Sequence, residues 1–522
     1  MTLLDQARQS SNVIDGSRIN KNLELSADIC VIGSGAGGAV AAHTLVTAGK
    51  DVLIVEEGGY FSHLDFSMNE AEVYPKLYQE GLQRATQDLG IAILQGRAVG
   101  GTTVVNWTTC FRTPEDVVDH WRTHHHVGGF KLADIIPHYE WIEDRLCMQK
   151  VPKEQMNPNN RKLFEGCKAL GWQVDTIKRN VYACMNSGYC GMGCPYNAKR
   201  SMLVTLIPDA ITSGARLLFR CRIDRLVENN NGIDHAEGTL LTTDGYHTRT
   251  ETVRIKAKHF IVAGGAINSP ALLLRSGIND HDRVGKRTFF HPSIVSVGLY
   301  DDPIEAYYGA PQSAASHHFS HRSENVGFFL EAAPLHPVLA STALPGFGFD
   351  HHENMKPFSH IAPHTALTID GFHSDLPGGQ VTLRPSGTPL INYPLTPALW
   401  ESFRFAQKRL AQAQFASGAK SVMTLHDPPL VMRSPNNIAD IDEQPFETCR
   451  IGVFSAHQMG GCGMGDNHQT AVVRSEDLRH HRLSNLYVMD GSVFPTSLGV
   501  NPQQSIYGLV RLMASRLVER IT

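Results

Sequence analysis

Long apolar runs separated by glycine-rich turns mark the N-terminal part of the chain. Residues 27–32 (ADICVI) form a continuous apolar run, which is typical of a strand buried on both faces of a parallel sheet. The alanine-rich segment 33–50 favours a helix, and residues 51–55 (DVLIV) form a second apolar run. This order predicts a βαβ unit, whereas the mainly polar residues 1–20 are expected to fray.

Two apolar runs of the same kind recur later, at residues 259–262 (HFIV) and 485–489 (NLYVM). Because the second run lies near the C-terminus, we expect the sheet to be assembled from both ends of the chain. Segment 291–449 differs, since its short alternating runs are broken by proline and glycine and residues 398–416 have a helical pattern. The predicted fold is α/β, with a doubly wound, Rossmann-like domain and an inserted α+β domain built on an antiparallel sheet.

Composition narrows the class of protein. With 522 residues, 42% hydrophobic and 19% charged, the chain is typical of a globular enzyme of more than one domain and not of a disordered or fibrous protein. A net charge of −4 without a dense basic run argues against nucleic acid as a partner. No apolar stretch approaches the roughly 20 residues of a membrane span, and the ten cysteines are too sparse for a disulfide framework. We therefore expect a cytoplasmic protein. Any peripheral association with a membrane would be through an electron-accepting partner.

Gly33, Gly35 and Gly38 form a GxGxxG motif, in which glycines allow a tight turn and a close approach to a pyrophosphate. By itself the motif is weak evidence, but here it stands between an apolar run and an alanine-rich helix pattern. Glu56 ends the next apolar run, where a carboxylate can bind both ribose hydroxyls and disfavours a 2′-phosphate. The context predicts a site for FAD or NAD rather than NADP.

Four further segments, in this order, resemble the glucose-methanol-choline (GMC) family of flavoprotein oxidoreductases. Residues 96–114 are similar to the family's Gly-Gly-Ser/Thr loop, which carries an asparagine against the flavin. Residues 264–278 are similar to a second family motif, although Asn279 stands where glycine is usual. The last two segments, residues 455–465 and 488–509, resemble those that bring the catalytic pair to the flavin in family members.

The resemblance implies FAD as the cofactor. Some family members carry a flavin-linking histidine immediately before the position of Asn106, whereas this chain has Val105, so we expect FAD to be held non-covalently. Without the resemblance, Asp490-Gly491 would be an ordinary turn and Asn501-Pro502 a helix cap. The residues predicted to bind the cofactor are Gly33, Gly35, Gly38, Glu56, Gly100, Gly101, Thr102, Asn106, Asp490, Gly491, Asn501 and Pro502.

The resemblance also implies how the chain divides into domains. The FAD-binding domain is expected to be discontinuous, over residues 21–130, 195–290 and 450–522. The substrate-binding domain is expected in residues 131–194 and 291–449.

His457 and Asn501 are the catalytic pair that the resemblance implies. Oxidation of an alcohol to an aldehyde or ketone removes a hydroxyl proton and a hydride, and the flavin accepts the hydride. A neutral imidazole is suited to take the proton, so His457 is the expected base, and Asn501 is expected to donate to the alcohol oxygen. The alternatives are an FAD-containing hydroxynitrile-type lyase and a non-catalytic flavin-binding protein.

Cys184, Cys190 and Cys194 form a Cx5Cx3C cluster that ends in Pro195. Its spacing resembles that of iron–sulfur sugar dehydrogenases of the same superfamily, which carry an additional cysteine beside the first. A polyol or sugar dehydrogenase with an iron–sulfur relay is therefore a further alternative. The other interpretation is a loop of reduced thiols over the cofactor, as in long-chain alcohol oxidases, and the predicted site contains no metal.

The substrate is weakly encoded. Segment 327–349 is apolar and rich in turns, which favours a cavity for an aliphatic or aryl alcohol and, more specifically, an apolar primary alcohol over a sugar. Oxygen, a quinone or a cytochrome is the expected electron acceptor, and the sequence does not choose between an oxidase and a dehydrogenase.

Overall fold

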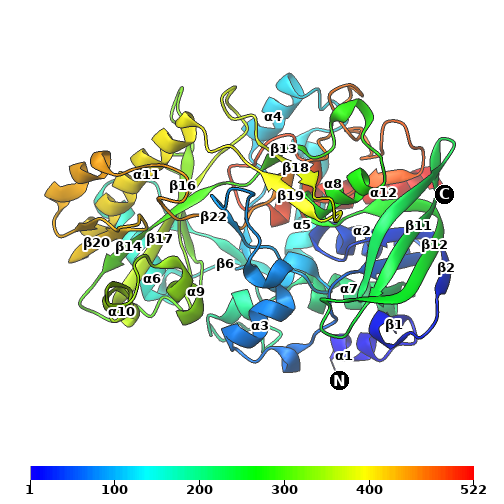
Figure 1. Ribbon diagram of the computed structural model, residues 1–522, viewed down its shortest axis with the longest axis horizontal. Helices are drawn as coiled ribbons and strands as arrows, with labels where there is room; N and C mark the ends of the chain where they lie inside the picture. The colour runs from blue at the N-terminus through cyan, green and yellow to red at the C-terminus, as the bar shows by residue number, and fades with distance from the viewer. Residues whose placement is uncertain (1, 522) are drawn as a thin grey trace.

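The computed structural model describes residues 2–521 as an elongated molecule with a large sheet toward each end of its long axis (Figure 1). The first sheet has eight strands in the order β1-β9-β3-β2-β12-β11-β10, with β24 beside β12. Its strands are β1 (Val13–Asp15), β2 (Leu23–Ile32), β3 (Val52–Glu56), β9 (Arg216–Phe219), β10 (Cys221–Asn229), β11 (Gly232–Leu241), β12 (Thr248–Val262) and β24 (Leu486–Val488).

The centre of this sheet is parallel. β2 pairs in parallel with β3 on one side and with β12 on the other, and β24 pairs in parallel with the end of β12. The register aligns Phe260 with Leu486 and Val262 with Val488. The sheet is therefore assembled from both ends of the chain, as predicted, and its antiparallel part is the edge formed by β11 and β10.

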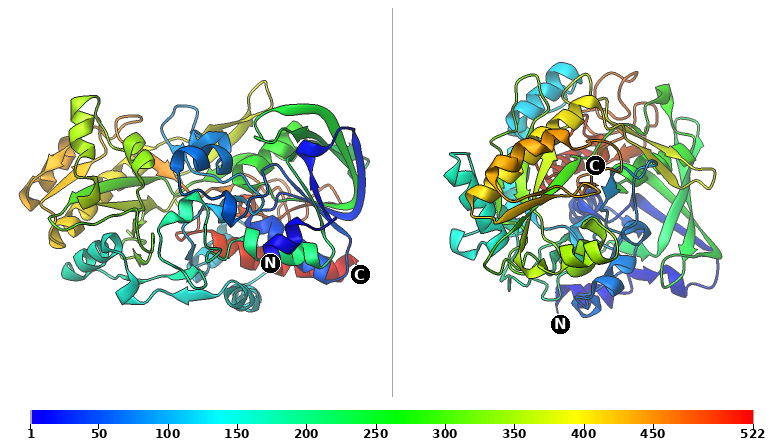
Figure 2. Two further views of the ribbon diagram at one scale, coloured as in Figure 1. Left: turned by 90° about the horizontal axis from the view of Figure 1, so that it is seen from below. Right: turned by 60° about the vertical axis from the view of Figure 1, so that its left-hand side comes forward.

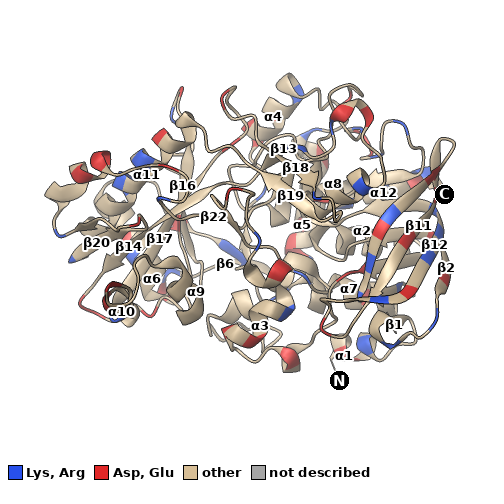
Figure 3. Cartoon of the chain, in the orientation of Figure 1, with Lys and Arg blue, Asp and Glu red and all other residues tan. Residues whose placement is uncertain are grey.

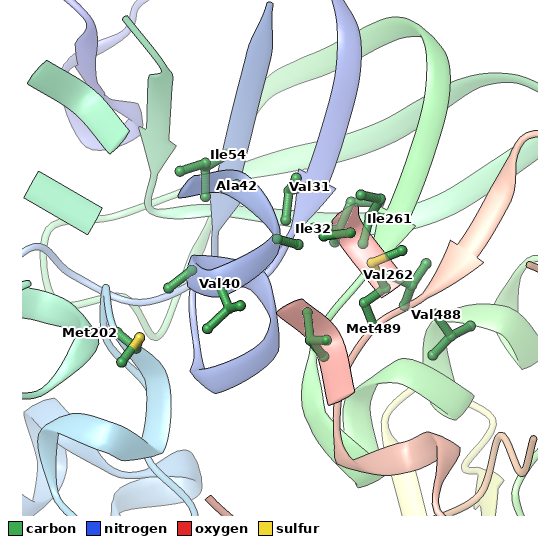
Figure 4. Close-up of a cluster of buried hydrophobic side chains, with 14 of the residues drawn as sticks. Val31, Ile32, Val40, Ala42, Ile54, Met202, Ile261, Val262, Val488 and Met489 are labelled. Atoms are coloured by element: carbon green, nitrogen blue, oxygen red, sulfur yellow. The ribbon is translucent and has the colours of Figure 1, made fainter. Parts of the chain in front are cut away.

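Helix α2 (Ala36–Thr47) follows β2 and packs against α12 (Gln503–Ile521) and α7 (Leu206–Thr212). Figure 4 shows a cluster of buried apolar side chains that includes Val40 and Ala42 of α2 together with side chains of β2, β12 and β24. Val31, Ile261 and Val488 are fully buried there. The apolar runs recognised in the sequence thus form one core around the turn that carries the glycine motif.

The N-terminal residues differ from the expectation that they fray. Helix α1 (Leu3–Arg8) is closed by a capping box between Thr2 and Asp5, and it buries Leu4 and Ala7. Strand β1 then pairs in parallel with β9. Polar residues facing solvent and two apolar anchors suffice for this short helix, which is why composition alone missed it.

The second sheet has nine strands in the order β21-β20-β14-β17-β16-β15-β7, with β22 between β14 and β4. Antiparallel pairs β14–β17 and β16–β17 form its centre, and helices α11 (Pro397–Ala416) and α6 (Pro158–Ala169) pack on it. Its strands are β4 (Ala92–Ile93), β7 (Asp175–Thr176), β14 (Ser293–Leu299), β15 (Ala314–Ser316), β16 (Phe328–Ala332), β17 (Ile361–Thr368), β20 (Ser421–Thr424), β21 (Val431–Met432) and β22 (Val453–Ser455).

Two small sheets complete the structure. The run around residues 379–392, expected in the large antiparallel sheet, forms a hairpin in a separate sheet of order β19-β18-β13-β23, and the other small sheet has the order β5-β8-β6. These strands are β13 (Lys286–Phe289), β18 (Gly379–Leu383), β19 (Pro389–Asn392), β23 (Met459–Gly460), β5 (Thr109–Cys110), β6 (Met148–Lys150) and β8 (Lys178–Asn180). The remaining helices are α3 (Glu70–Leu77), α4 (Glu115–His124), α5 (Leu132–Arg145), α8 (Gly265–Arg275), α9 (Pro337–Ala343) and α10 (Phe349–Met355).

The α/β architecture with an antiparallel second sheet is confirmed, while the domain ranges expected from the sequence stay a prediction. Strands β4 and β22 come from ranges assigned to the first domain but pair in the second sheet. In the cartoon of Figure 3, positively and negatively charged residues are both spread over the molecule, from the elements of the first sheet to those of the second. Both chain ends lie near the first sheet (Figure 2). Within residues 2–521, no helix combines the length and the apolar character needed to cross a membrane.

Candidate cofactor and active site

A cavity of about 720 Å³ is lined by residues from both large sheets. On one side it meets the carboxyl ends of β2, β3, β12 and β24, which is where open α/β sheets bind ligands. On the other side it meets β14, β16 and β17 of the antiparallel sheet. The volume lies within the roughly 300–1,000 Å³ that is usual for ligand pockets.

The glycine motif forms the turn from β2 into α2 beneath this cavity. Gly33 has a φ of +106°, and a Cβ there would lie 2.3 Å from the carbonyl oxygen of Ala263. Gly33 and Gly35 line the cavity. Gly38 does not, because it packs behind the turn, where a Cβ would lie 1.9 Å from the carbonyl oxygen of Gly33. Two of the three glycines therefore leave room for a ligand and the third closes the packing.

Glu56 lies at the end of β3 and lines the same cavity. Its Oε2 accepts hydrogen bonds from the backbone N–H of Ser34 (3.0 Å) and from the Ser34 hydroxyl (2.6 Å), and its Oε1 accepts from Gly58 N–H (2.8 Å). Burial raises the pKa of this carboxyl. Glu56 thus ties the glycine turn to β3 in addition to the ribose contact predicted from the sequence.

The loop of residues 96–106 crosses directly over the glycine turn. A Cβ on Gly101 would lie 2.6 Å from the Cα of Gly35, so only glycine allows this approach. Gly101 and Thr102 line the cavity, whereas Gly100 does not. Gly100 instead donates its N–H to the Ser34 hydroxyl at 3.0 Å, which fixes the loop to the turn.

Asn106, at the end of this loop, has one satisfied and one unsatisfied polar atom. Its Nδ2 donates to Oε1 of Gln503 at 2.7 Å, while its buried Oδ1 has no partner. A buried acceptor without a donor costs free energy, so this cavity-lining amide fits a ligand that brings an N–H group. The isoalloxazine ring of FAD carries such a donor, and the residues present therefore fit this cofactor.

Asp490 follows β24 and lines the cavity together with Gly491 and Pro502. Its Oδ2 accepts from Gly265 N–H at 2.7 Å and from the Ser269 hydroxyl, and its Oδ1 accepts from Ser492 N–H at 2.8 Å. Burial raises the pKa of the Asp490 carboxyl. The carboxylate joins the first turns of α8 to the segment after β24, at the place where the sequence predicts a cofactor contact.

The structure brings His457 and Asn501 together, although they come from different elements. His457 follows β22 and Asn501 precedes α12, and the His457 Nε2 lies 3.2 Å from the Asn501 Nδ2. Both side chains line the cavity. Burial lowers the pKa of His457 to about 4, so the ring is neutral at pH 7. The predicted pair therefore faces one ligand site.

Glu331 is a site residue that the sequence analysis missed. It lies on β16 and lines the cavity, and its Oε2 accepts from Gln312 Nε2 at 2.8 Å and lies 3.5 Å from the Asn501 Nδ2. Its buried Oε1 has no partner, and burial raises its pKa to about 8. A signal was available, because Glu331 is the one acidic residue in the apolar segment 327–349.

His291 is the second residue that was missed. Its ring is fully buried, and its Nδ1 lies 3.1 Å from the Nδ1 of His457. No motif in the sequence marks it, since it is one of 26 histidines and contacts His457 only through the fold.

The part of the cavity away from the glycine turn is largely apolar. Segment 327–349 contributes to it as the sequence predicted, through Leu335 and through Leu339 of α9. Leu344, which follows α9, also belongs to this segment, and further aliphatic and aromatic lining residues come from the antiparallel sheet and its loops: Val295, Val297, Leu367, Leu425 and Phe454.

The cysteine cluster surrounds the short turn of residues 189–192. Cys190 is buried and its Sγ lies 3.4 Å from the Arg179 Nη2, whereas Cys184 and Cys194 are partly exposed. Among residues 2–521, no group of three or more His, Cys, Asp or Glu side chains is arranged to hold a metal ion.

Comparison with known proteins agrees with this geometry. The GMC oxidoreductase family models match residues 74–293 and 376–509. A GMC-type oxidoreductase of Mycobacterium tuberculosis is 32% identical over 95% of this chain and 76% of its own length. A long-chain-alcohol oxidase of Arabidopsis thaliana is 27% identical over 96% of this chain and 69% of its own length.

Among solved structures, pyridoxine 4-oxidase from Mesorbium loti has a TM-score of 0.69 at 18% identity, covering 94% of this chain and 99% of that chain. Formate oxidase of Aspergillus oryzae has a TM-score of 0.66 at 13% identity, covering 95% and 98%. These likenesses support the same fold. The chain therefore belongs to the GMC oxidoreductase family, and it is a flavoprotein whose cofactor is FAD.

Proposed function

We propose that this flavoprotein oxidises an apolar primary alcohol to the aldehyde at the cavity between the two sheets. The observation that carries the proposal is the placement of His457 and Asn501, 3.2 Å apart, where the glycine-rich cofactor side of the cavity meets its apolar side. An alcohol bound by its alkyl chain against the apolar residues would present its hydroxyl to this pair.

The apolar lining supports the choice of substrate class. Leu335, Leu339 and Leu344 provide surface for a hydrocarbon chain, and few polar groups on that side could bind the several hydroxyls of a sugar. The similarity to long-chain-alcohol oxidases of Arabidopsis thaliana points in the same direction.

FAD, when bound, supplies a hydride acceptor for the carbon that bears the hydroxyl. The residues proposed to hold it are the cavity-lining members of the predicted set, and Val105 leaves it without a covalent link. His457 and Asn501 are proposed to contact the hydroxyl oxygen, fix its position and stabilise the negative charge that develops there. The buried pair excludes water from the reacting atoms, which strengthens these contacts.

The test is anaerobic addition of alcohols of increasing chain length to the FAD-loaded protein while the flavin absorbance is recorded. We expect long-chain primary alcohols to bleach the flavin and sugars to leave it oxidised. Reoxidation with oxygen, a quinone or a cytochrome then identifies the acceptor. If no alcohol bleaches a flavin that dithionite reduces normally, the proposal is wrong, and turnover of a hydroxynitrile without bleaching would identify a lyase.

A matched variant tests the pair. His457→Ala is expected to retain FAD and to lose alcohol-driven flavin reduction by about 10²–10⁴-fold, the usual contribution of a side chain that exchanges or holds a proton in the transition state. Near-normal flavin reduction in this variant would exclude a role of His457 in the reaction.

A further inference from the structure

Two buried positive charges lie beside the loop that ends in Asn106. Lys199 and Arg179 are each only 2% exposed. Lysine and arginine are almost never fully buried unless a partner of opposite charge accompanies them. In the described part of the chain, residues 2–521, neither forms an ion pair with an Asp or Glu side chain. The fold therefore removes two cations from water without a carboxylate to balance them.

The hydrogen bonds of Lys199 determine its charge. Its Nζ donates to the backbone carbonyls of Val104, Asn106 and Cys190. Three carbonyl oxygens can accept only from a nitrogen that carries three hydrogens, which is the ammonium form. Burial lowers the pKa of Lys199 to about 8, which still leaves the side chain protonated at pH 7. The hydrogen bonds and the pKa therefore agree on a buried positive charge.

Arg179 adds a second charge close to the first. Its Nε donates to the Thr108 hydroxyl at 2.8 Å, and its Nη2 lies 3.4 Å from the Sγ of Cys190. A guanidinium keeps its proton in proteins, so this charge is permanent. The Cys190 thiol does not cancel it, because burial raises the pKa of that thiol and keeps it neutral at pH 7. Both positive charges are thus unbalanced.

Both cations hold the segment that lines the cofactor side of the cavity. Lys199 binds the carbonyls of the residues before and after Val105, and Val105 and Asn106 line the cavity. Thr108, which accepts from Arg179, lines it as well. The buried Oδ1 of Asn106 is the acceptor that fits an N–H group of the flavin ring. The charges therefore lie directly behind the backbone that the ring would contact.

A structural role alone would not require charged side chains here. Neutral amides donate to buried carbonyls elsewhere in this chain: Asn159 Nδ2 donates to the Ala333 carbonyl, and Gln414 Nε2 donates to the carbonyls of Ser296 and Ala362. A neutral amide costs far less free energy to remove from water than an ammonium or a guanidinium. The use of two cations at the loop thus points to a role for their charge.

We infer that Lys199 and Arg179 are positioning residues that hold the flavin-contacting loop and raise the reduction potential of the bound FAD. Hydride transfer moves two electrons and one proton, and hence one negative charge, from the substrate carbon to the cofactor site. A positive charge nearby in a medium of low dielectric constant favours this change. The inference depends on FAD as the cofactor and goes beyond the proposed function, because it holds for any substrate that donates a hydride.

Lys199→Gln tests the charge of Lys199. The amide can still donate to two of the three carbonyls, but it is neutral. The midpoint potential of the FAD-loaded protein is measured anaerobically against a reference dye during slow reduction by dithionite, without any alcohol. We expect the equilibrium constant for reduction to fall by about 10-fold or more at unchanged FAD content, which lowers the potential by about 30 mV or more for a two-electron couple.

The matched control is Lys178→Gln, which removes the same charge from the residue next to Arg179. The Lys178 side chain is 45% exposed and pairs with Glu143, so solvent screens it and its loss should leave the potential unchanged. A potential that Lys199→Gln leaves unaltered, or that both variants lower equally, would overturn the inference. Because no alcohol enters the measurement, this outcome is independent of the proposed alcohol oxidation.

Arg179→Gln provides a second test, since it leaves the three hydrogen bonds of Lys199 in place. It should also lower the potential relative to the unaltered protein, so the role of charge remains testable if Lys199→Gln does not retain FAD. Loss of FAD from both variants would overturn the inference, because the two cations would then serve to build the site and not to set its potential.

Discussion

Burial decides the charge of the ionisable side chains around the cavity. Glu331 and His457 are both removed from water, and in each the charged form is disfavoured, so the carboxyl gains and the imidazole loses affinity for a proton. Neither residue has an oppositely charged partner within the site. These two side chains are thus mostly uncharged near neutral pH, which suits the apolar alcohol proposed as the substrate.

The raised pKa of Glu331 predicts how stability depends on pH. Its pKa rises from 4.5 to about 8 on folding, so below pH 4.5 both states hold the proton and stability is fully present. As the pH rises toward 8, the unfolded chain loses the proton first and stability is lost. Between pH 5 and 8.5, Glu331→Gln should therefore gain stability relative to the unaltered protein by more than about 1.4 kcal/mol, the value of one pKa unit.

Urea unfolding of the FAD-loaded protein at both pH values measures this gain. Glu519→Gln, at the exposed end of α12, is the control and should show no such trend. A difference between the Glu331 variant and the unaltered protein that stays constant with pH would contradict the predicted protonation.

Residue types in motifs could be assigned from the sequence, whereas their partners could not. The glycine turn, Asn106 and the His457–Asn501 pair all lie at one cavity. The sequence could predict these residues because each of them lies in a motif of a few neighbouring positions. Glu331 and His291 are brought beside Asn501 and His457 by contacts between distant segments, and no local pattern records such contacts. Gly38 and Gly100, which were also predicted to bind the cofactor, do not line the cavity: Gly38 packs behind the turn, and Gly100 donates its N–H to the Ser34 hydroxyl.

At the scale of elements, the close crossing of α2 over the end of β24 determines where the cofactor side of the cavity lies. A Cβ on Gly37, in the first turn of α2, would lie 1.9 Å from the carbonyl oxygen of Met489. Long apolar runs predicted β2, β3, β12 and β24, since such strands are buried on both faces. The two-residue strand β4 and the three-residue strand β22 carry too little pattern, and only packing between distant segments defines them.

Two alanine substitutions in the glycine turn should separate folding from cofactor binding. Gly37→Ala places its new Cβ against the carbonyl oxygen of Met489 and is expected to lower the free energy of unfolding by about 1–3 kcal/mol. Gly35→Ala places its Cβ 3.7 Å from the Cα of Gly101, an ordinary contact, so the fold should persist while FAD affinity falls.

Thermal unfolding of both apoproteins and titration with FAD provide the measurements. If Gly37→Ala were no less stable than Gly35→Ala, the close crossing at Gly37 would be contradicted.

At the scale of the whole molecule, helix α12 contacts both the loop that ends in Asn106 and helix α2, which follows the glycine turn. Gln503, the first residue of α12, accepts from Asn106 Nδ2 at 2.7 Å and donates to the Thr109 carbonyl at 2.6 Å. Farther along, α12 packs against α2 and α5 and buries residues as far as Leu517. The helix therefore belongs to the FAD side of the molecule, although it is the last element of the chain.

Shortening the chain tests this dependence. A chain that ends at Pro502 lacks α12 and is expected to purify without flavin absorbance, because the Asn106 loop and α2 lose their packing partner. The control ends at Glu519 and retains every buried residue of α12, so it should keep FAD. Flavin bound at full stoichiometry by the shorter chain would show that the helix is dispensable.

The pairing of β24 with β12 also constrains when this protein can mature. The central sheet lacks one of its parallel strands until the segment around Leu486–Val488 has left the ribosome, and α12 follows even later. Contacts between such distant segments form slowly, and the apolar edge of β12 stays open to wrong partners until they do. FAD can therefore be bound only after the segment that contains β24 and α12 has been synthesised, and the edge of β12 that pairs with β24 is exposed until then.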